Sequence, residues 1–560
     1  MIQGLGSGAV MMTGLCAGGR RLGKISPGPL CSVAGGRQMR GPTAFWQALE
    51  AARRENLRER GAATPEPGHD GQTRRHVLLA LAATAATAAL PRPARAAASG
   101  APVVIIGGGI AGLTALWHLT KSGVDARLYE ARTRLGGRMY TARAKGVPSI
   151  EIGGQLVNTD HADMHALCRE FGVQLIDRKG GQHRTMILDG EHEVPEGRVV
   201  AGLRGIAGQI DADSVRLDQN YAKVAAELDR MSFTGYLDKY ARLIPEPWVR
   251  RLMEATARTE YGCEPAQASA IELVFNLPTI DGRRIDVLSR SDERYLMAGG
   301  SSSLIEAMAA RLASRITTYR RAVRIDPSPS GARVVFSNGD KIDASAVIVT
   351  TPASIMSRIA YGVPLPPLWR QFIAEVGLGK NGKVQAVTNA RPWEKPIGRG
   401  GEIWQTDRDA GSSLGWDGGV RPAAGPGSVW TWFTGGDEVL AADQADPRAL
   451  ALKLARLAES GVKGMAAATG ATVRRTNWHL DPFSMGAYVN FRPGQLTKFA
   501  DLIWTETDGI PSTPMGAGPV HFAGEHLSDA YPGYMNGGAQ TGRLAAQSVI
   551  AARAPARRMG

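Results

Sequence analysis

Short runs of apolar residues, separated by glycines, mark the first clear structural elements of the chain. Residues 102–106 (Pro-Val-Val-Ile-Ile) form a continuous apolar stretch, which predicts a buried parallel strand. A glycine-rich segment at 107–112 follows directly, and residues 113–122 have the character of a helix. Residues 126–129 predict a second strand, which ends at Glu130. This order of strand, glycine turn, helix, strand and acid is that of a dinucleotide-binding unit.

The glycines of this unit each meet a steric requirement of dinucleotide binding. Gly107 allows a tight turn, Gly109 lets the backbone approach a pyrophosphate, and Gly112 lets the helix pack closely on the sheet. The helix N-terminus then directs unpaired N–H groups toward the phosphates. Glu130 follows Gly112 by 18 residues, and an acid there binds the ribose hydroxyls and disfavours the 2′-phosphate of NADP. The predicted contact residues are Gly107, Gly109, Ile110, Ala111, Gly112, Glu130 and Ala131.

Composition and charge exclude several other classes of protein. The 560 residues are 43% hydrophobic and 21% charged, as in ordinary globular proteins. The formal net charge is +14, but residues 1–96 carry +8 of it, with 13 Lys and Arg against 5 Asp and Glu. The remaining +6 is too diffuse for a nucleic-acid-binding patch. The four cysteines exclude a disulfide scaffold and lack metal-ligand spacing, so we expect no metal site.

Residues 73–96 have the three parts of a secretory signal. Arg74 and Arg75 precede an apolar run of 13 residues that ends at Leu90, and an Ala-x-Ala sequence closes the segment. The paired arginines favour the twin-arginine export machinery, and hence a periplasmic or secreted protein. The alternative is an uncleaved, alanine-rich helix. Because such signals normally lie near the start of translation, we expect the true start further along the chain, with Met39 the nearest candidate.

No apolar stretch of the chain reaches the roughly 18 residues that a membrane-spanning helix needs. We therefore expect no stable membrane insertion of the mature protein. The oligomeric state is left open, a homodimer included.

Taken together, these and later segments resemble the flavin amine oxidase superfamily, which includes monoamine oxidases, polyamine oxidases, L-amino-acid oxidases and tryptophan 2-monooxygenase. The resemblance covers residues 101–552 in family order. It implies an α/β fold with a discontinuous, Rossmann-like FAD-binding domain and a mixed α+β substrate domain. The implied segments are 1–96 for the leader, 101–185, 290–355 and 515–552 for the FAD-binding domain, and 186–289 and 356–514 for the substrate domain.

The resemblance identifies the cofactor as FAD and extends its site beyond the first glycine turn. After Glu130, an Arg-x-Gly-Gly-Arg segment ends at Arg138 and resembles one that brings an arginine against the pyrophosphate in FAD oxidoreductases. Residues 151–157 resemble the segment beside the isoalloxazine ring, and residues 520–546 closely resemble the C-terminal FAD motif, with a helix that begins near Gly537. The implied further cofactor residues are Arg132, Gly137, Arg138, Gly154, Gln155, Leu156, Val323, Trp478, Gly524, Glu525, Tyr534 and Met535.

Three residues carry the implied chemistry. Lys383, followed ten residues later by Trp393, matches the lysine that holds a water at flavin N5. By spacing alone Tyr488 and Tyr534 read as core residues, but the resemblance implies that they form an aromatic cage around the substrate amine. The implied reaction is hydride transfer from the amine-bearing carbon to flavin N5. The imine then hydrolyses to an aldehyde or ketone, and O2 is reduced to H2O2 or a protein accepts the electrons.

Departures from the family pattern narrow the function. Ala487 stands where monoamine oxidases have a cysteine linked to FAD, so we expect non-covalent FAD. Leu156 stands where amino-acid oxidases have an arginine for the substrate carboxylate, which favours an amine substrate. An arginine from residues 283–284 or Arg290 could replace it. The alternatives are therefore an L-amino-acid oxidase, a tryptophan 2-monooxygenase or a desaturase-like flavoprotein. Asp160 reads as solvated, or as an acid that holds the distal nitrogen of a polyamine.

Overall fold

The computed structural model describes residues 52–53, 55–59, 61, 100–275, 279–281, 284–286, 292–421, 425–504, 506–507, 510–511 and 516–553. The predicted signal segment and Met39 lie outside the described residues, and so do Arg290 and the side chains at 283–284. The described part of residues 41–560 forms one compact unit, so the boundary between the two predicted domains stays a prediction. Within the described residues, every helix is too short or too polar to cross a bilayer.

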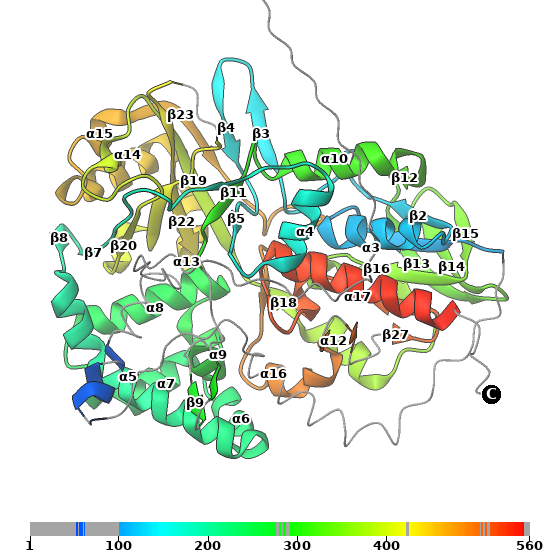
Figure 1. Ribbon diagram of the computed structural model, residues 1–560, viewed down its shortest axis with the longest axis horizontal. Helices are drawn as coiled ribbons and strands as arrows, with labels where there is room; N and C mark the ends of the chain where they lie inside the picture. The colour runs from blue at the N-terminus through cyan, green and yellow to red at the C-terminus, as the bar shows by residue number, and fades with distance from the viewer. Residues whose placement is uncertain are drawn as a thin grey trace, which may run out of the picture. The chain divides into compact units, whose positions relative to one another are not determined.

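A six-stranded sheet forms the dinucleotide side of the molecule, in the order β12-β2-β1-β16-β28-β27 (Figure 1). All neighbouring strands pair in parallel except β27, which is antiparallel to β28. The strands are β1 (Val103–Ile106), β2 (Ala126–Tyr129), β12 (Ile316–Thr317), β16 (Ala346–Val349), β27 (Gly516–Ala517) and β28 (Val520–Phe522). Each of the three segments predicted for FAD binding therefore supplies two strands to this sheet, and the predicted strands at 102–106 and 126–129 are confirmed.

Two helices lie side by side against this sheet, α3 (Ile110–Lys121) and α17 (Met535–Arg553) (Figure 1). The helix predicted at 113–122 begins three residues earlier than expected, at Ile110. Gly112 therefore lies inside its first turn. Glycines let the two helices touch: a Cβ on Gly538 would lie 2.8 Å from Cγ2 of Ile110, and one on Gly542 would lie 2.2 Å from the carbonyl oxygen of Ala111. This close packing brings the start of α17 near the start of α3.

A mixed seven-stranded sheet forms the other side, in the order β23-β19-β22-β21-β20-β7-β8. Helices α5 (Glu196–Gln219), α8 (Pro247–Tyr261) and α9 (Ala270–Phe275) lie on one side of it, with α14 (Pro447–Leu457) against β19 and β23. The strands are β7 (Thr185–Asp189), β8 (His192–Glu193), β19 (Asn381–Thr388), β20 (Glu402–Gln405), β21 (Leu414–Asp417), β22 (Ser428–Gly435) and β23 (Thr469–Arg475). This mixture of helices and strands agrees with the predicted fold class.

Smaller sheets accompany the two large ones. Strand β17 lies in the segment predicted for the substrate domain, yet it pairs with β13 beside the dinucleotide sheet, because the chain returns there before it enters β19. The four-stranded sheet has the order β15-β14-β13-β17, and a short pair joins β18 to β24. These strands are β13 (Ala322–Ser328), β14 (Gly331–Phe336), β15 (Lys341–Ala344), β17 (Ala360–Tyr361), β18 (Gly377–Leu378) and β24 (Val489–Asn490).

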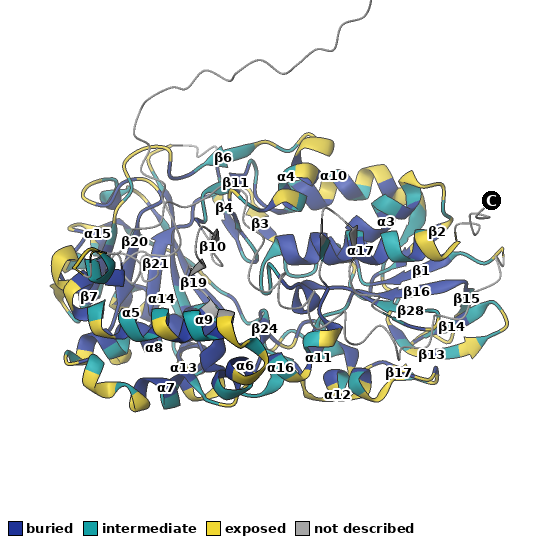
Figure 2. Cartoon of the chain, turned by 60° about the horizontal axis from the view of Figure 1, so that its bottom comes forward, coloured by how far each residue is buried: buried dark blue, intermediate teal, exposed yellow. Residues whose placement is uncertain are grey.

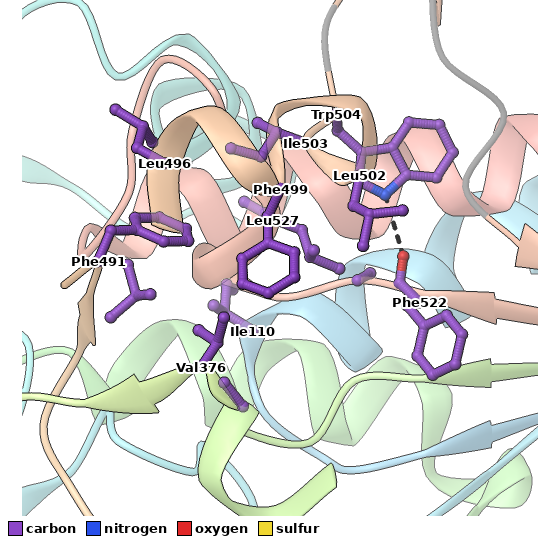
Figure 3. Packing of buried hydrophobic residues seen from close by; sticks show 14 of the residues in the cluster. Ile110, Val376, Phe491, Leu496, Phe499, Leu502, Ile503, Trp504, Phe522 and Leu527 are labelled. Carbon is purple, nitrogen blue, oxygen red and sulfur yellow. Dashed lines mark hydrogen bonds between the residues drawn. The ribbon is translucent and has the colours of Figure 1, made fainter. Parts of the chain in front are cut away.

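The hydrophobic core runs continuously from the dinucleotide sheet into the neighbouring helices. Strands β1, β16 and β28 are buried, whereas the outer faces of α5 and α7 (Phe233–Lys239) are exposed (Figure 2). Figure 3 shows Phe499 and Leu527 packed beside Ile110, the first residue of α3. Trp504 donates a hydrogen bond from Nε1 to the carbonyl oxygen of Phe522 at 3.0 Å. Residues near 500 thus hold the end of β28 in place beneath the site.

Candidate active site

A cavity of about 1000 Å³ lies between the carboxyl ends of the dinucleotide strands and the seven-stranded sheet. Every residue that the sequence predicted for cofactor or substrate lines this cavity, with the exception of Gly112. Ligands of open α/β sheets bind at the carboxyl ends of the strands, which is where the cavity lies. The structure therefore brings together residues that are almost 430 positions apart, such as Gly107 and Met535.

Gly112 supports the site from inside helix α3. A Cβ at this position would lie 2.0 Å from the carbonyl oxygen of Gly107 and 2.8 Å from Oγ1 of Thr350. Gly107 itself has a φ of +111°, a conformation open mainly to glycine. Gly107 therefore forms a tight turn, and Gly112 lets helix α3 pack closely on it.

The start of α3 fits a phosphate group. Gly109 is the N-cap, has no side-chain cap, and is followed by no acid in the first turn of the helix. The helix therefore presents its first N–H groups, and with them the positive end of its dipole, to the cavity. Glu130 accepts hydrogen bonds from the backbone N–H of Gly108 at 2.7 Å and of Arg132 at 2.8 Å. Its carboxylate holds the turn in shape, and its contact with a ribose stays a prediction.

Arg138 and Glu525 form an ion pair that joins three segments of the cavity wall. Nη1 of Arg138 donates to Oε1 of Glu525 at 2.8 Å and to the carbonyl oxygen of Ala487. The other carboxylate oxygen of Glu525 accepts from the backbone N–H of Gly533 at 2.8 Å and of Val489 at 3.3 Å. Both residues line the cavity, but in this arrangement they fix the two segments that carry Tyr488 and Tyr534.

Lys383 lies buried on β19 with its ammonium group at the cavity wall. Nζ donates to the carbonyl oxygens of Gly153 at 2.7 Å and of Glu151 at 3.1 Å. These two bonds leave a third N–H without a protein partner among the described residues, so it is free to hold a small molecule such as water. Burial lowers the pKa of Lys383 to about 8, against the opposing influence of the Glu151 carboxylate.

The tryptophan that follows Lys383 in the sequence lies elsewhere. Trp393 is fully buried in a second hydrophobic cluster, where its ring lies 4.8 Å from that of Trp430. It does not line the cavity, whereas Trp416 and Trp478 do. The ring of Trp416 lies 5.9 Å from Nζ of Lys383. The sequence spacing between Lys383 and Trp393 therefore pointed to the lysine, but the tryptophan that lies beside this lysine in space is Trp416.

Tyr488 and Tyr534 both lie on the cavity wall, as expected for an aromatic cage. The hydroxyl of Tyr488 donates to the carbonyl oxygen of Thr259, and its ring lies 3.5 Å from the position a Cβ of Gly533 would take. The ring of Tyr534 meets that of His161 edge to face at 5.2 Å. Burial raises the pKa of Tyr488 well above its ordinary value, so its hydroxyl stays protonated. These contacts hold Tyr488 and Tyr534 in defined positions.

Three acids on the substrate side of the cavity were not among the residues predicted from the sequence. Glu260 in the last turn of α8, Glu272 on α9 and Glu293 line the wall there. A carboxylate in the last turn of a helix opposes the helix dipole, and this was the one available signal for Glu260. Asp160 also lines the cavity, whereas Asp163 forms an ion pair with Arg543 at 2.6 Å.

The chain is similar to known proteins in sequence and in fold. The profile of a family described as flavin containing amine oxidoreductase matches residues 110–550. An L-amino acid dehydrogenase from Synechocystis sp. is 24% identical over 480 residues, which cover 81% of this chain and 96% of that protein. A putative flavin-containing monoamine oxidase from Mycobacterium tuberculosis is 26% identical over 466 residues, which cover 80% of this chain and 96% of that protein. The structure of cyclohexylamine oxidase from Brevibacterium oxydans is similar with a TM-score of 0.69 at 21% identity, covering 80% of this chain and 99% of that one.

Proposed function

The chain belongs to the family of flavin-containing amine oxidoreductases, and we propose that it oxidises an amine whose reacting carbon carries no carboxylate. It is an FAD-dependent oxidoreductase that acts on amines. One observation carries the proposal on the substrate: Lys383, Tyr488 and Tyr534 share a single cavity wall with the dinucleotide turn. FAD, when bound, takes up the hydrogen and two electrons from the amine-bearing carbon and passes the electrons to an acceptor.

The residues of the chain supply position and electrostatics. The start of α3 and the segment that ends at Arg138 would hold the pyrophosphate, and Glu130 the ribose. Tyr488 and Tyr534 orient the neutral amine nitrogen between their rings. The third N–H of Lys383 holds a water, and its positive charge favours electron transfer to O2. FAD is bound non-covalently, because Ala487 offers no thiol and neither described cysteine, Cys168 or Cys263, lines the cavity.

The composition of the wall supports an amine over an α-amino acid. The arginines of the described wall are Arg132, Arg138, Arg320, Arg321 and Arg358. All follow strands of the dinucleotide sheet, where they would face the cofactor. The substrate side presents Leu156 and the acids on α8 and α9 instead. A substrate carboxylate placed there would lose its hydration without gaining an arginine from the described part of the wall.

A second candidate is oxidation of an L-amino acid, which the similarity to an L-amino acid dehydrogenase favours. A panel of monoamines, diamines and L-amino acids, mixed anaerobically with the purified holoenzyme, separates the two. We expect amines to bleach the flavin absorbance and the matching α-amino acids to leave it unchanged. Bleaching by amino acids alone would reject the proposal. Consumption of O2 with stoichiometric H2O2 would identify O2, rather than a protein, as the electron acceptor.

Export through the twin-arginine machinery is a further part of the proposal. The sequence at 73–96 supports this proposal. The twin-arginine route transports folded proteins, so FAD can bind to the enzyme before export. Cell fractionation and N-terminal sequencing test it, with a mature chain that starts near Ala97 in the periplasm as the expected result. A full-length chain in the cytoplasm would reject it.

A further inference from the structure

A fully buried histidine lies directly behind the aromatic cage. His161 is 0% exposed and does not line the cavity. Its ring meets two rings that do line it: that of Tyr534 at 5.2 Å with an angle of 68° between the planes, and that of Tyr531 at 5.4 Å and 86°. The imidazole therefore contacts the cavity wall from behind, edge to face, without reaching the space in which a substrate binds.

The two ring nitrogens of His161 differ in their surroundings. Nδ1 accepts a hydrogen bond from the backbone N–H of Asn158 at 3.1 Å, so in the neutral ring the proton is on Nε2. Burial lowers the pKa of His161 to about 3, so the ring is neutral in the pH range of ordinary assays. Nε2 has no oxygen or nitrogen partner among the described residues. A buried N–H without such a partner is costly, and the faces of the neighbouring tyrosine rings are the acceptors within reach.

A role in the local secondary structure does not account for this side chain. His161 is the N-cap of helix α4 (Ala162–Glu170), yet its side chain makes no cap hydrogen bond to that helix. The described residues also contain no cluster of three or more His, Cys, Asp or Glu side chains that could hold a metal ion. The ring contacts of His161 instead point toward the cavity wall, to Tyr531 and Tyr534.

The backbone on both sides of this ring contact is tied to the segment that carries the second cage tyrosine. The N–H of Met164, in the first turn of α4, donates to Oδ1 of Asn536 at 3.0 Å. The hydroxyl of Tyr531 donates to the carbonyl oxygen of Asp160 at 3.0 Å. Helix α4 lies against α17, which begins directly after that tyrosine (Figure 1). Two hydrogen bonds thus flank the ring contact and limit how far its rings can move apart.

We propose that His161 is a positioning residue: its imidazole holds the ring of Tyr534 at the angle at which the cage receives the amine nitrogen. The inference rests on the proposed function, because the angle of this ring matters to catalysis only if an amine enters the cage. His161 takes up no proton and no electrons, and it acts through Tyr534. Its effect is therefore confined to reduction of the flavin by the amine, and reoxidation by O2 does not depend on it.

Two substitutions separate the ring of His161 from its hydrogen bond. His161→Asn removes the ring and keeps an acceptor for the N–H of Asn158, whereas His161→Phe keeps a ring and removes that acceptor. In anaerobic stopped-flow mixing of the holoenzyme with an amine, we expect His161→Asn to lower the rate constant of flavin reduction at least about tenfold. His161→Phe should keep this rate constant within about threefold of wild type, because a phenyl ring makes the same edge-to-face contact. Reoxidation by O2 should be equal in all three proteins. The reverse order, or equal reduction rates in the two variants, would overturn the inference.

A second change tests whether His161 acts through Tyr534. In a Tyr534→Leu background, His161→Asn should lower the reduction rate constant by no more than about twofold further, because the ring that it positions is already gone. A further loss as large as in the protein that retains Tyr534 would overturn the inference. Phe171→Leu is the matched control, since Phe171 ends α4 and meets Trp117 edge to face at 5.0 Å outside the cavity wall. This variant loses an aromatic pair of the same kind and should leave flavin reduction unchanged.

A measurement without turnover separates the inference from the proposed function. Fluorine NMR of the holoenzyme labelled with 3-fluorotyrosine reports on each tyrosine ring, and Tyr534→Phe identifies the resonance of Tyr534. We expect this resonance to shift and broaden in His161→Asn and to keep its position in Phe171→Leu. An unchanged Tyr534 resonance in His161→Asn would overturn the inference. A wild-type flavin that no amine reduces, together with a shifted Tyr534 resonance in His161→Asn, would instead reject the proposed function alone.

Discussion

The two ends of the cavity differ in charge and in the way the chain builds them. The cofactor end is formed by residues that follow parallel strands, with five arginines and the uncapped start of α3. The substrate end is formed by single residues from α8, α9 and loops, and the charged groups that it presents within the described residues include the carboxylates of Glu260, Glu272 and Glu293. A local sequence pattern determines the glycine turn of the first end, whereas single residues from distant segments make up the second.

The largest effect is expected from a change that breaks the cofactor end alone. In Gly112→Ala the new Cβ would meet the carbonyl oxygen of Gly107 at 2.0 Å, so helix and turn must separate. We expect the ratio of flavin to protein absorbance to fall at least about tenfold, because the pyrophosphate cradle is lost. The control is Gly197→Ala on α5, where nothing lies within 4 Å of the new atom. A Gly112→Ala protein with full flavin content and normal melting temperature would contradict this account.

The next effect concerns Lys383, where the two ends meet. In Lys383→Met the charge and the third N–H are lost, and we expect reoxidation of the flavin by O2 to slow about 100-fold, as when one fixed donor is removed from an active site. Stopped-flow mixing of reduced enzyme with O2 measures this rate. Reduction of the flavin by the amine serves as the internal control, since the lysine is assigned to the O2 step. Equal slowing of both steps would contradict the assignment.

The pKa of Lys383 adds a pH dependence to this test. Burial lowers it from 10.5 to about 8, so the ammonium loses its proton as the pH rises through about 8. Because the charged form favours electron transfer to O2, the wild-type reoxidation rate should fall above about pH 8. The profile of Lys383→Met should stay flat there. A fall of the same size in both proteins would assign the titration to another group.

The difference between the ends also explains what could be predicted from the sequence. The strands at 102–106 and 126–129 and the turn between them form within one short segment, where Gly112 packs directly against Gly107. Lys383, Tyr488 and Tyr534 could be identified only through the family resemblance. Nothing near Glu293 in the sequence marks it, since its position depends on Asn158 and Arg178. The segment boundaries are equally non-local, as the pairing of β17 with β13 illustrates.

A smaller effect on kcat/KM is expected from loss of the Tyr488 hydroxyl, because the ring forms the cage and the hydroxyl only holds the ring in position. Tyr488→Phe keeps the ring of the cage and removes the hydrogen bond to Thr259. We expect kcat/KM for the preferred amine to fall about fivefold, equivalent to about 1 kcal/mol for one hydrogen bond. Tyr361→Phe is the control, because the buried hydroxyl of Tyr361 has no partner in the described residues and lies outside the cavity wall. Identical kinetics in wild type and Tyr488→Phe would mean that the hydroxyl does not position the cage.

The smallest effect on activity is expected at Trp393, and it separates family spacing from spatial position. Trp393 packs against Trp430 away from the cavity, whereas Trp416 lies beside Lys383. Trp393→Phe should lower the free energy of unfolding by about 1–2 kcal/mol, because it removes buried contact area, and should leave kcat/KM within about twofold. Trp416→Phe should do the reverse, changing the kinetics more than the melting temperature. Thermal unfolding and steady-state kinetics on both variants decide the matter. If Trp393→Phe impaired turnover at unchanged stability, the sequence spacing between Lys383 and Trp393 would mark a functional pair after all.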